Sequence, residues 1–111
     1  MKLAIIGSRC VQKIDIGRYL PKDVEEIVSG GATGADKLAA EYAKRHGIPL
    51  VEFLPDYKRY RSGAPIRRNE QIAAYADQAL AFWDGSSRGT KRTIELFHSM
   101  GKQVTVIRVE E

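Results

Sequence analysis

Consecutive apolar residues occur in five short segments, and longer segments with helical periodicity separate most of them. Runs that are continuously apolar, rather than alternating with polar residues, are typical of strands covered on both faces of a parallel sheet. We therefore predict strands at residues 2–6, 25–29, 50–53, 78–82 and 103–107.

The segments between these runs carry the signals of helices. In residues 35–46, Leu38 and Tyr42 fall on one helical face. Asp36 in the first turn suits the positive end of the helix dipole, and Gly47 is the expected stop. Further helices are predicted at residues 14–20, 65–75 and 90–100.

Strands and helices that alternate in this way predict an α/β fold with a parallel sheet and right-handed crossovers. We expect a single Rossmann-like domain over residues 1–111, with a five-stranded parallel sheet of order 3-2-1-4-5 flanked by helices. Ligands of such sheets bind outside the carboxyl ends of the strands, where the strand order reverses. Here that point lies between the first and fourth strands, which are followed by residues 7–9 and 84–90.

Composition narrows the class of protein. The chain has 111 residues, of which 43% are hydrophobic and 29% charged, as in ordinary globular domains. No apolar run approaches the ~20 residues of a membrane span, and the N-terminal run is too short for a secretory signal. The single cysteine, Cys10, excludes an internal disulfide and a cysteine-rich zinc site. We expect a cytoplasmic protein with no membrane partner, no metal and no cofactor.

The positive charge is unevenly distributed. The net charge is +4, from 18 Lys and Arg against 14 Asp and Glu, which is compatible with acidic small molecules or nucleic acid as partners. One segment concentrates the cations Lys58, Arg59, Arg61, Arg67 and Arg68. Tyr57 and Tyr60 are interleaved with the first of these, which suits stacking on single-stranded nucleic acid. An ordinary surface loop, or a lid over the ligand pocket, is the alternative interpretation.

A cluster of glycines follows the second strand. Gly30, Gly31 and Gly34 lie directly before the helix at residues 35–46. Glycines let backbone N–H groups approach a ligand, and the helix N-terminus adds a positive dipole end, so this loop is a candidate phosphate site. The alternative is a tight turn with close helix–sheet packing. The usual dinucleotide fingerprint G-x-G-x-x-G and the Walker motif are both absent.

Several motifs together resemble one family. They are IIGSR at residues 5–9, SGGATGADKLAAEYA at 29–43, PIRRNEQIAAYAD at 65–77 and AFWDGSSRGTKRTIE at 81–95. In this order they resemble the SLOG superfamily, which unites the DNA-processing protein A (Smf) proteins with the LOG phosphoribohydrolases. The small stand-alone YspA-like members are the most similar group.

The resemblance implies a Rossmann-like fold that binds a nucleotide or a nucleotide-derived small molecule, in a sensor or accessory role. It implies homo-oligomers as well, which an exposed Trp83 or Phe97 would favour. In that family the G-G-x-x-G loop contacts phosphate and the later G-T turn lies in the same pocket. The implied ligand-binding residues are Gly7, Ser8, Arg9, Gly30, Gly31, Thr33, Gly34, Gly89 and Thr90.

Two further elements are candidate ligand contacts. Arg67, Arg68 and Asn69 resemble the R-N element of the DNA-processing proteins, and their functional interpretation is contact with an anion and with a base or ribose edge. A solvated helix surface is the alternative. Asp84 follows the fourth strand, where it can bind a ribose hydroxyl or cap a turn.

One departure from the family concerns catalysis. The LOG enzymes carry P-G-G-x-G-T-x-x-E with a catalytic glutamate, whereas this chain has Thr93 three positions after Thr90. Glu95 is two residues further on, which on a helix is a rotation of roughly 200°. The candidate catalytic carboxylates are therefore Glu70, Asp84 and Glu95, and hydrolysis of a nucleotide N-glycosidic bond is an alternative function. A single-stranded nucleic-acid-binding module is the second alternative.

Overall fold

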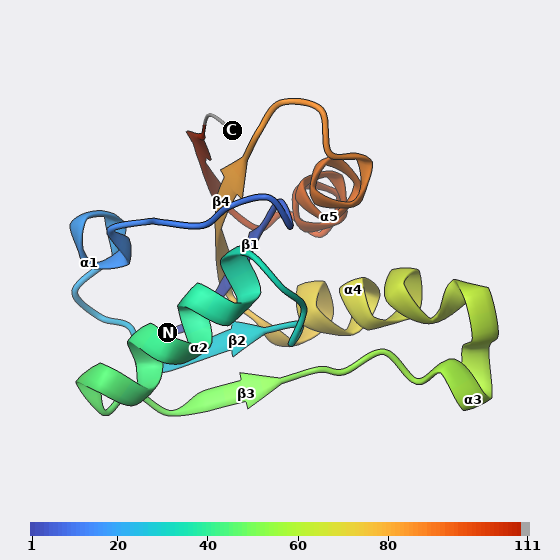
Figure 1. Ribbon diagram of the computed structural model, residues 1–111, viewed down its shortest axis with the longest axis horizontal. Helices are drawn as coiled ribbons and strands as arrows, with labels where there is room; N and C mark the ends of the chain where they lie inside the picture. The colour runs from blue at the N-terminus through green and yellow to red at the C-terminus, as the bar shows by residue number, and fades with distance from the viewer. Residues whose placement is uncertain (110–111) are drawn as a thin grey trace.

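The central element of the fold is a five-stranded, all-parallel sheet with strand order β3-β2-β1-β4-β5 (Figure 1). The computed structural model describes residues 1–109. The strands are β1 (Lys2–Gly7), β2 (Glu26–Ser29), β3 (Leu50–Glu52), β4 (Gln78–Trp83) and β5 (Val104–Arg108). The helices are α1 (Ile16–Tyr19), α2 (Ala35–His46), α3 (Tyr57–Tyr60), α4 (Ala64–Tyr75) and α5 (Arg88–Ser99), and a 3-10 turn η1 (Arg61–Gly63) precedes α4.

The two central strands are covered on both faces, which explains their continuous apolar sequence. In the register of β1 and β4, Ile5 lies opposite Leu80. One hydrophobic cluster joins these strands to α1 and α2, and a second joins them to α4 and α5. Burial on both faces is what the apolar runs predict for the middle of a parallel sheet. The predicted fold class and strand order are confirmed.

The expectation of a loop around residues 57–61 is wrong. Tyr57–Tyr60 form the short helix α3, and η1 connects it to α4. The Asp56 side chain accepts a hydrogen bond from the backbone N–H of Arg59 at 3.2 Å, which is the bond of a helix N-cap. The Tyr60 ring lies beneath the guanidinium groups of Arg59 and Arg67. The N-cap and the stacked guanidinium groups therefore order this segment as a helix. Its charge pattern in the sequence indicates only that it is exposed.

Two side chains bear on the expected self-association. Phe97 is completely buried in the cluster beneath α5, so it offers no exposed anchor. Trp83 is partly buried and donates a hydrogen bond from Nε1 to the carbonyl of Ser87. Neither residue supplies the exposed aromatic surface that would favour homo-oligomers. In the part of the chain that the structure describes, every helix is too short or too polar to cross a membrane.

Candidate functional site

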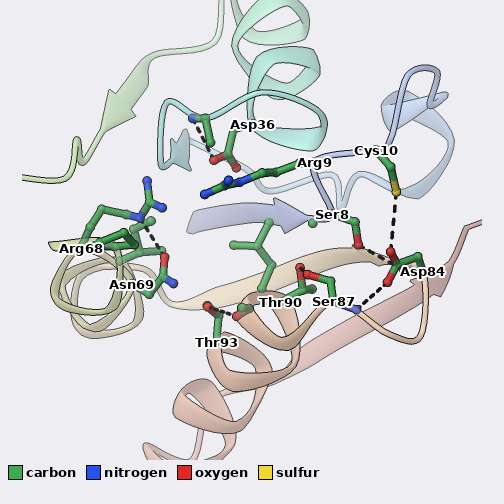
Figure 2. Close-up of a pocket in the computed structure, with 16 residues that line it drawn as sticks. Ser8, Arg9, Cys10, Asp36, Arg68, Asn69, Asp84, Ser87, Thr90 and Thr93 are labelled. Atoms are coloured by element: carbon green, nitrogen blue, oxygen red, sulfur yellow. Dashed lines mark hydrogen bonds between the residues drawn. The ribbon is translucent and has the colours of Figure 1, made fainter. Parts of the chain in front are cut away.

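A cavity of about 440 Å³ lies at the carboxyl ends of β1 and β4, where the strand order reverses (Figure 2). Its walls come from the ends of these two strands, from the start of α2, from α4 and from the start of α5. Both cavity volume and location match the ligand sites of open α/β sheets, which are commonly ~300–1,000 Å³.

Most of the predicted ligand-binding residues line this cavity. They are Gly7, Ser8, Arg9, Arg68, Asn69, Asp84, Gly89 and Thr90. The cavity lining does not include the other predicted residues, which are Gly30, Gly31, Thr33, Gly34 and Arg67. The glycine loop is represented in the lining by Ala32 alone.

Close packing explains two of the glycines in the loop. Gly34 has φ +74°, and a Cβ there would lie 2.5 Å from the carbonyl oxygen of Ser8. A Cβ on Gly30 would lie 2.6 Å from Nη1 of Arg68. Any side chain at these positions would displace the backbone after β1 or the buried arginine. The loop therefore has the features of the tight-turn interpretation.

Asp36 is a cavity residue that sequence reasoning missed. It is 9% exposed, and its Oδ2 accepts a hydrogen bond from the backbone N–H of Ala32 at 3.1 Å. Burial raises the pKa of this carboxyl, while the Ala32 N–H and the Arg68 charge oppose the rise. In the sequence, an acid in the first turn of a helix is explained by the dipole alone. The sequence feature that could have identified Asp36 is its position two residues after a glycine loop that follows a strand.

The neighbouring arginines of α4 have different environments. Arg68 is buried, with Nη1 donating to the carbonyl of Gly30 at 2.5 Å and Nε donating to Oδ1 of Asn69 at 2.8 Å. Arg67 points to solvent, where it forms an ion pair with Glu70 at 3.3 Å. Arg68 and Asn69 therefore belong to the cavity wall, and Arg67 does not.

The first turn of α5 forms the wall opposite α2. Gly89 and Thr90 line the cavity there, together with Ser87, the N-cap residue, whose Oγ lies 3.2 Å from Oγ1 of Thr90. The first turn holds no acidic residue, and the exposed cations Arg88, Lys91 and Arg92 surround it. Cations near a helix N-terminus oppose the dipole, so this end of α5 concentrates positive potential.

Asp84 caps the turn between β4 and α5. Its Oδ1 accepts hydrogen bonds from the backbone N–H groups of Ser86 at 2.9 Å and Ser87 at 2.8 Å, and its Oδ2 lies 3.6 Å from Sγ of Cys10. The two backbone bonds lower the pKa of Asp84 to about 2. It is thus an ionised carboxylate at the rim of the cavity near neutral pH, and much of its bonding capacity is used by the turn.

The three candidate catalytic carboxylates are separated by the fold. Asp84 lines the cavity, whereas Glu70 and Glu95 lie outside its lining. Glu95 is exposed on α5. Thr93 lines the cavity, and its Oγ1 donates to the carbonyl of Gly89 at 2.9 Å. A neutral hydroxyl thus takes the position where the resemblance would require the LOG glutamate.

The cavity combines positively charged and polar groups. Arg9 reaches across it from the end of β1 toward Arg68 (Figure 2). Within residues 1–109, no group of three His, Cys, Asp or Glu side chains is arranged to hold a metal ion. This set of two arginines, a helix N-terminus, hydroxyls and two carboxylates suits a polar ligand that carries both an anion and hydrogen-bond donors.

Comparison with known proteins gives a family match over part of the chain. A family model described as the YspA, cpYpsA-related SLOG family matches residues 8–60. No curated protein and no solved structure matches the chain. The matched residues include the end of β1, the glycine loop and α2, which contribute Ser8, Arg9 and Asp36 to the cavity. This match supports membership of the chain in the SLOG superfamily.

Proposed function

We propose that the cavity binds a nucleotide or a nucleotide-derived small molecule. The observation that carries this proposal is the conjunction, in one cavity of about 440 Å³, of Arg9 with the first turn of α5, which has no acid of its own. A volume of that order accommodates a mononucleotide. The SLOG match supports the same general class of ligand.

We propose the phosphate position at the first turn of α5. Helix N-terminal N–H groups and the dipole favour an anion there, and the hydroxyls of Ser87 and Thr90 add donors. The Gly30–Gly34 loop, the expectation from sequence, is a poorer candidate because the Asp36 carboxylate already accepts the Ala32 N–H. A second anion beside a buried carboxylate is repelled.

Binding without turnover would suit a sensor or accessory role. Thr93 replaces the glutamate that the LOG enzymes use, so the cavity has anion-binding groups without the family's catalytic one. The proposed function is therefore ligand recognition rather than chemistry.

The test is a binding screen on the purified protein, by thermal shift and then calorimetry. The ligands are AMP, GMP, CMP, UMP, ADP-ribose, NAD and cyclic nucleotides. A ligand at a hundred times its Kd should stabilise the protein by about 2.7 kcal/mol. The absence of any shift across the set would overturn the proposal.

The matched variants are Arg9→Ala and Arg45→Ala. Arg9 lines the cavity, whereas Arg45 is exposed in the last turn of α2, far from its lining. Loss of a charged hydrogen bond should weaken binding roughly tenfold or more in the first variant and leave it unchanged in the second. Equal affinities in the two variants would contradict a contribution of Arg9 to the binding of the anion.

A further inference from the structure

Asp36 is a buried carboxylate of the cavity that a phosphate site does not explain. It lies in the first turn of α2, across the end of β1 from Ser87 and Thr90 (Figure 2). Its Oδ2 accepts the hydrogen bond from Ala32, and the backbone of Gly30 is a second donor to this carboxyl. An ionised carboxylate offers about four acceptor positions, so these two bonds leave acceptor capacity next to the cavity.

Holding the loop does not by itself require a charge at this position. Burying a carboxylate is costly unless it is paired, and an uncharged Asn or Ser could accept the same N–H. Arg68 does not supply a direct pair. Its Nη1 and Nε donate to Gly30 and Asn69, and no ion pair within 4.0 Å joins it to Asp36 in the described chain. The Arg68 charge acts on Asp36 through space, without a direct ion pair that would occupy the carboxylate oxygens.

We propose that Asp36 accepts hydrogen bonds from donor groups of the bound nucleotide, either the ribose hydroxyls or an exocyclic amino group of the base. This inference rests on the proposed function, because it assigns the second end of the same ligand. The phosphate lies at α5, and the donor-bearing part of the ligand lies at α2. Asp36 is then a specificity-determining residue that selects ligands by their donors.

The charge of Asp36 also limits what can occupy this end of the cavity. Its ionised form disfavours an anionic group in contact with it, and Glu52 adds a second negative charge nearby, while Arg68 offsets part of this effect. A ligand with phosphates at both ends would place one of them against the Asp36 carboxylate. The site should therefore prefer nucleotides whose anionic groups are gathered at one end and whose other end carries N–H or O–H groups.

The experiment pairs changes in the ligand with a change in the protein. Calorimetry compares AMP with 2′-deoxy-AMP, with 3′-deoxy-AMP and with purine riboside 5′-monophosphate, which lacks the amino group. If another nucleoside monophosphate binds more tightly, its corresponding deoxy and deamino forms are used. Each series is measured on the wild-type protein, on Asp36→Asn and on Asp36→Ser, which both keep an acceptor for the Ala32 N–H.

We expect at least one donor deletion to weaken binding to the wild type roughly tenfold or more, the size of a hydrogen bond to a charged group. The same deletion should cost only about twofold in the Asp36 variants, because the charged partner is already missing. The comparison of the deoxy nucleotides with the deamino nucleotide then shows whether Asp36 contacts the ribose or the base. A purely structural role for Asp36 would weaken all ligands by the same factor.

Two results separate failure of this inference from failure of the proposed function. If the parent nucleotide binds and every deletion costs the same in wild type and variants, Asp36 does not read donors, and this inference is overturned while nucleotide binding stands. If no nucleotide binds the wild type, the proposed function itself fails. Asp15→Asn, which removes an exposed carboxylate outside the cavity lining, is the control and should leave every ratio at its wild-type value.

Discussion

The guanidinium of Arg68 donates a hydrogen bond from Nη1 to the backbone carbonyl of Gly30, 2.5 Å away, and so joins α4 to the end of β2. The bond is buried and connects residues 38 positions apart in the chain. It holds the glycine loop and the cavity wall of α4 in one arrangement. An arginine that resembles a ligand contact in sequence thus has a structural role in the fold.

Removing this arginine should destabilise the protein. Arg68→Ala leaves the Gly30 carbonyl without its donor and takes the charge from beside Asp36, so we expect unfolding free energy to fall by about 2–3 kcal/mol. Arg67→Ala breaks the exposed ion pair with Glu70 and the contact with the Tyr60 ring, and should cost at most about 1 kcal/mol. Urea unfolding of both variants measures the difference, and equal losses would contradict the structural role of Arg68.

Gly89→Ala should separate stability from binding. Gly89 lies in the first turn of α5, and a Cβ there meets nothing within 4 Å. Alanine should therefore raise the stability of the free protein by a few tenths to about 1 kcal/mol. Because Gly89 lines the cavity at the proposed phosphate position, the added methyl group should weaken nucleotide binding. Thermal unfolding and calorimetry measure the two effects, and undiminished affinity would argue against a phosphate at α5.

The two cavity carboxyls should affect stability in opposite directions as pH changes. Backbone hydrogen bonds lower the pKa of Asp84 to about 2, so its stabilising contribution is present above its ordinary value of 3.8 and is lost as pH falls toward about 2. Asp84→Asn should reduce this acid sensitivity. The free energy of unfolding measured between pH 5 and 2 tests this prediction. The same dependence on pH in the wild type and the variant would contradict it.

For Asp36 the sign is reversed. Burial raises its pKa above 3.8, so the folded state holds this proton more tightly than the unfolded chain does. Its contribution is most favourable below pH ~4 and declines as pH rises through the raised pKa. The charged groups near it are Arg68 and Glu52, and Arg9 lies in the same cavity. Asp36→Asn should flatten this part of the stability profile, and a profile identical to that of the wild type would contradict the assigned shift.

The chain should not hydrolyse nucleoside monophosphates at an appreciable rate. Cleavage of an N-glycosidic bond builds positive charge on the ribose, which a nearby carboxylate stabilises, and Thr93 supplies only a hydroxyl in the cavity. We expect less than ~1 s⁻¹ of base release from AMP, GMP, CMP or UMP, which chromatography can follow. Faster release would refute the prediction. If Asp84→Asn abolished this faster release of base, Asp84 would be identified as the substitute carboxylate.

The sequence alone determined the sheet and the place of the cavity. Strands in the middle of a parallel sheet are apolar on both faces, so β1 and β4 are recognisable without knowledge of their partners. Glycine at position 47 ends α2 as expected. Because ligands of such sheets bind where the strand order reverses, the predicted order also located the cavity between these strands.

Only the tertiary structure decided which side chains enter that cavity. Consecutive residues on a helix differ by about 100° in direction, so Arg67 faces solvent while Arg68 is buried against Gly30, although both are arginines. Asp36 became a cavity residue because α2 packs its first turn against the end of β1, a relationship between segments that no local pattern records. Charge and motif are local properties of the sequence, whereas the direction of a side chain and its neighbours depend on how the elements pack.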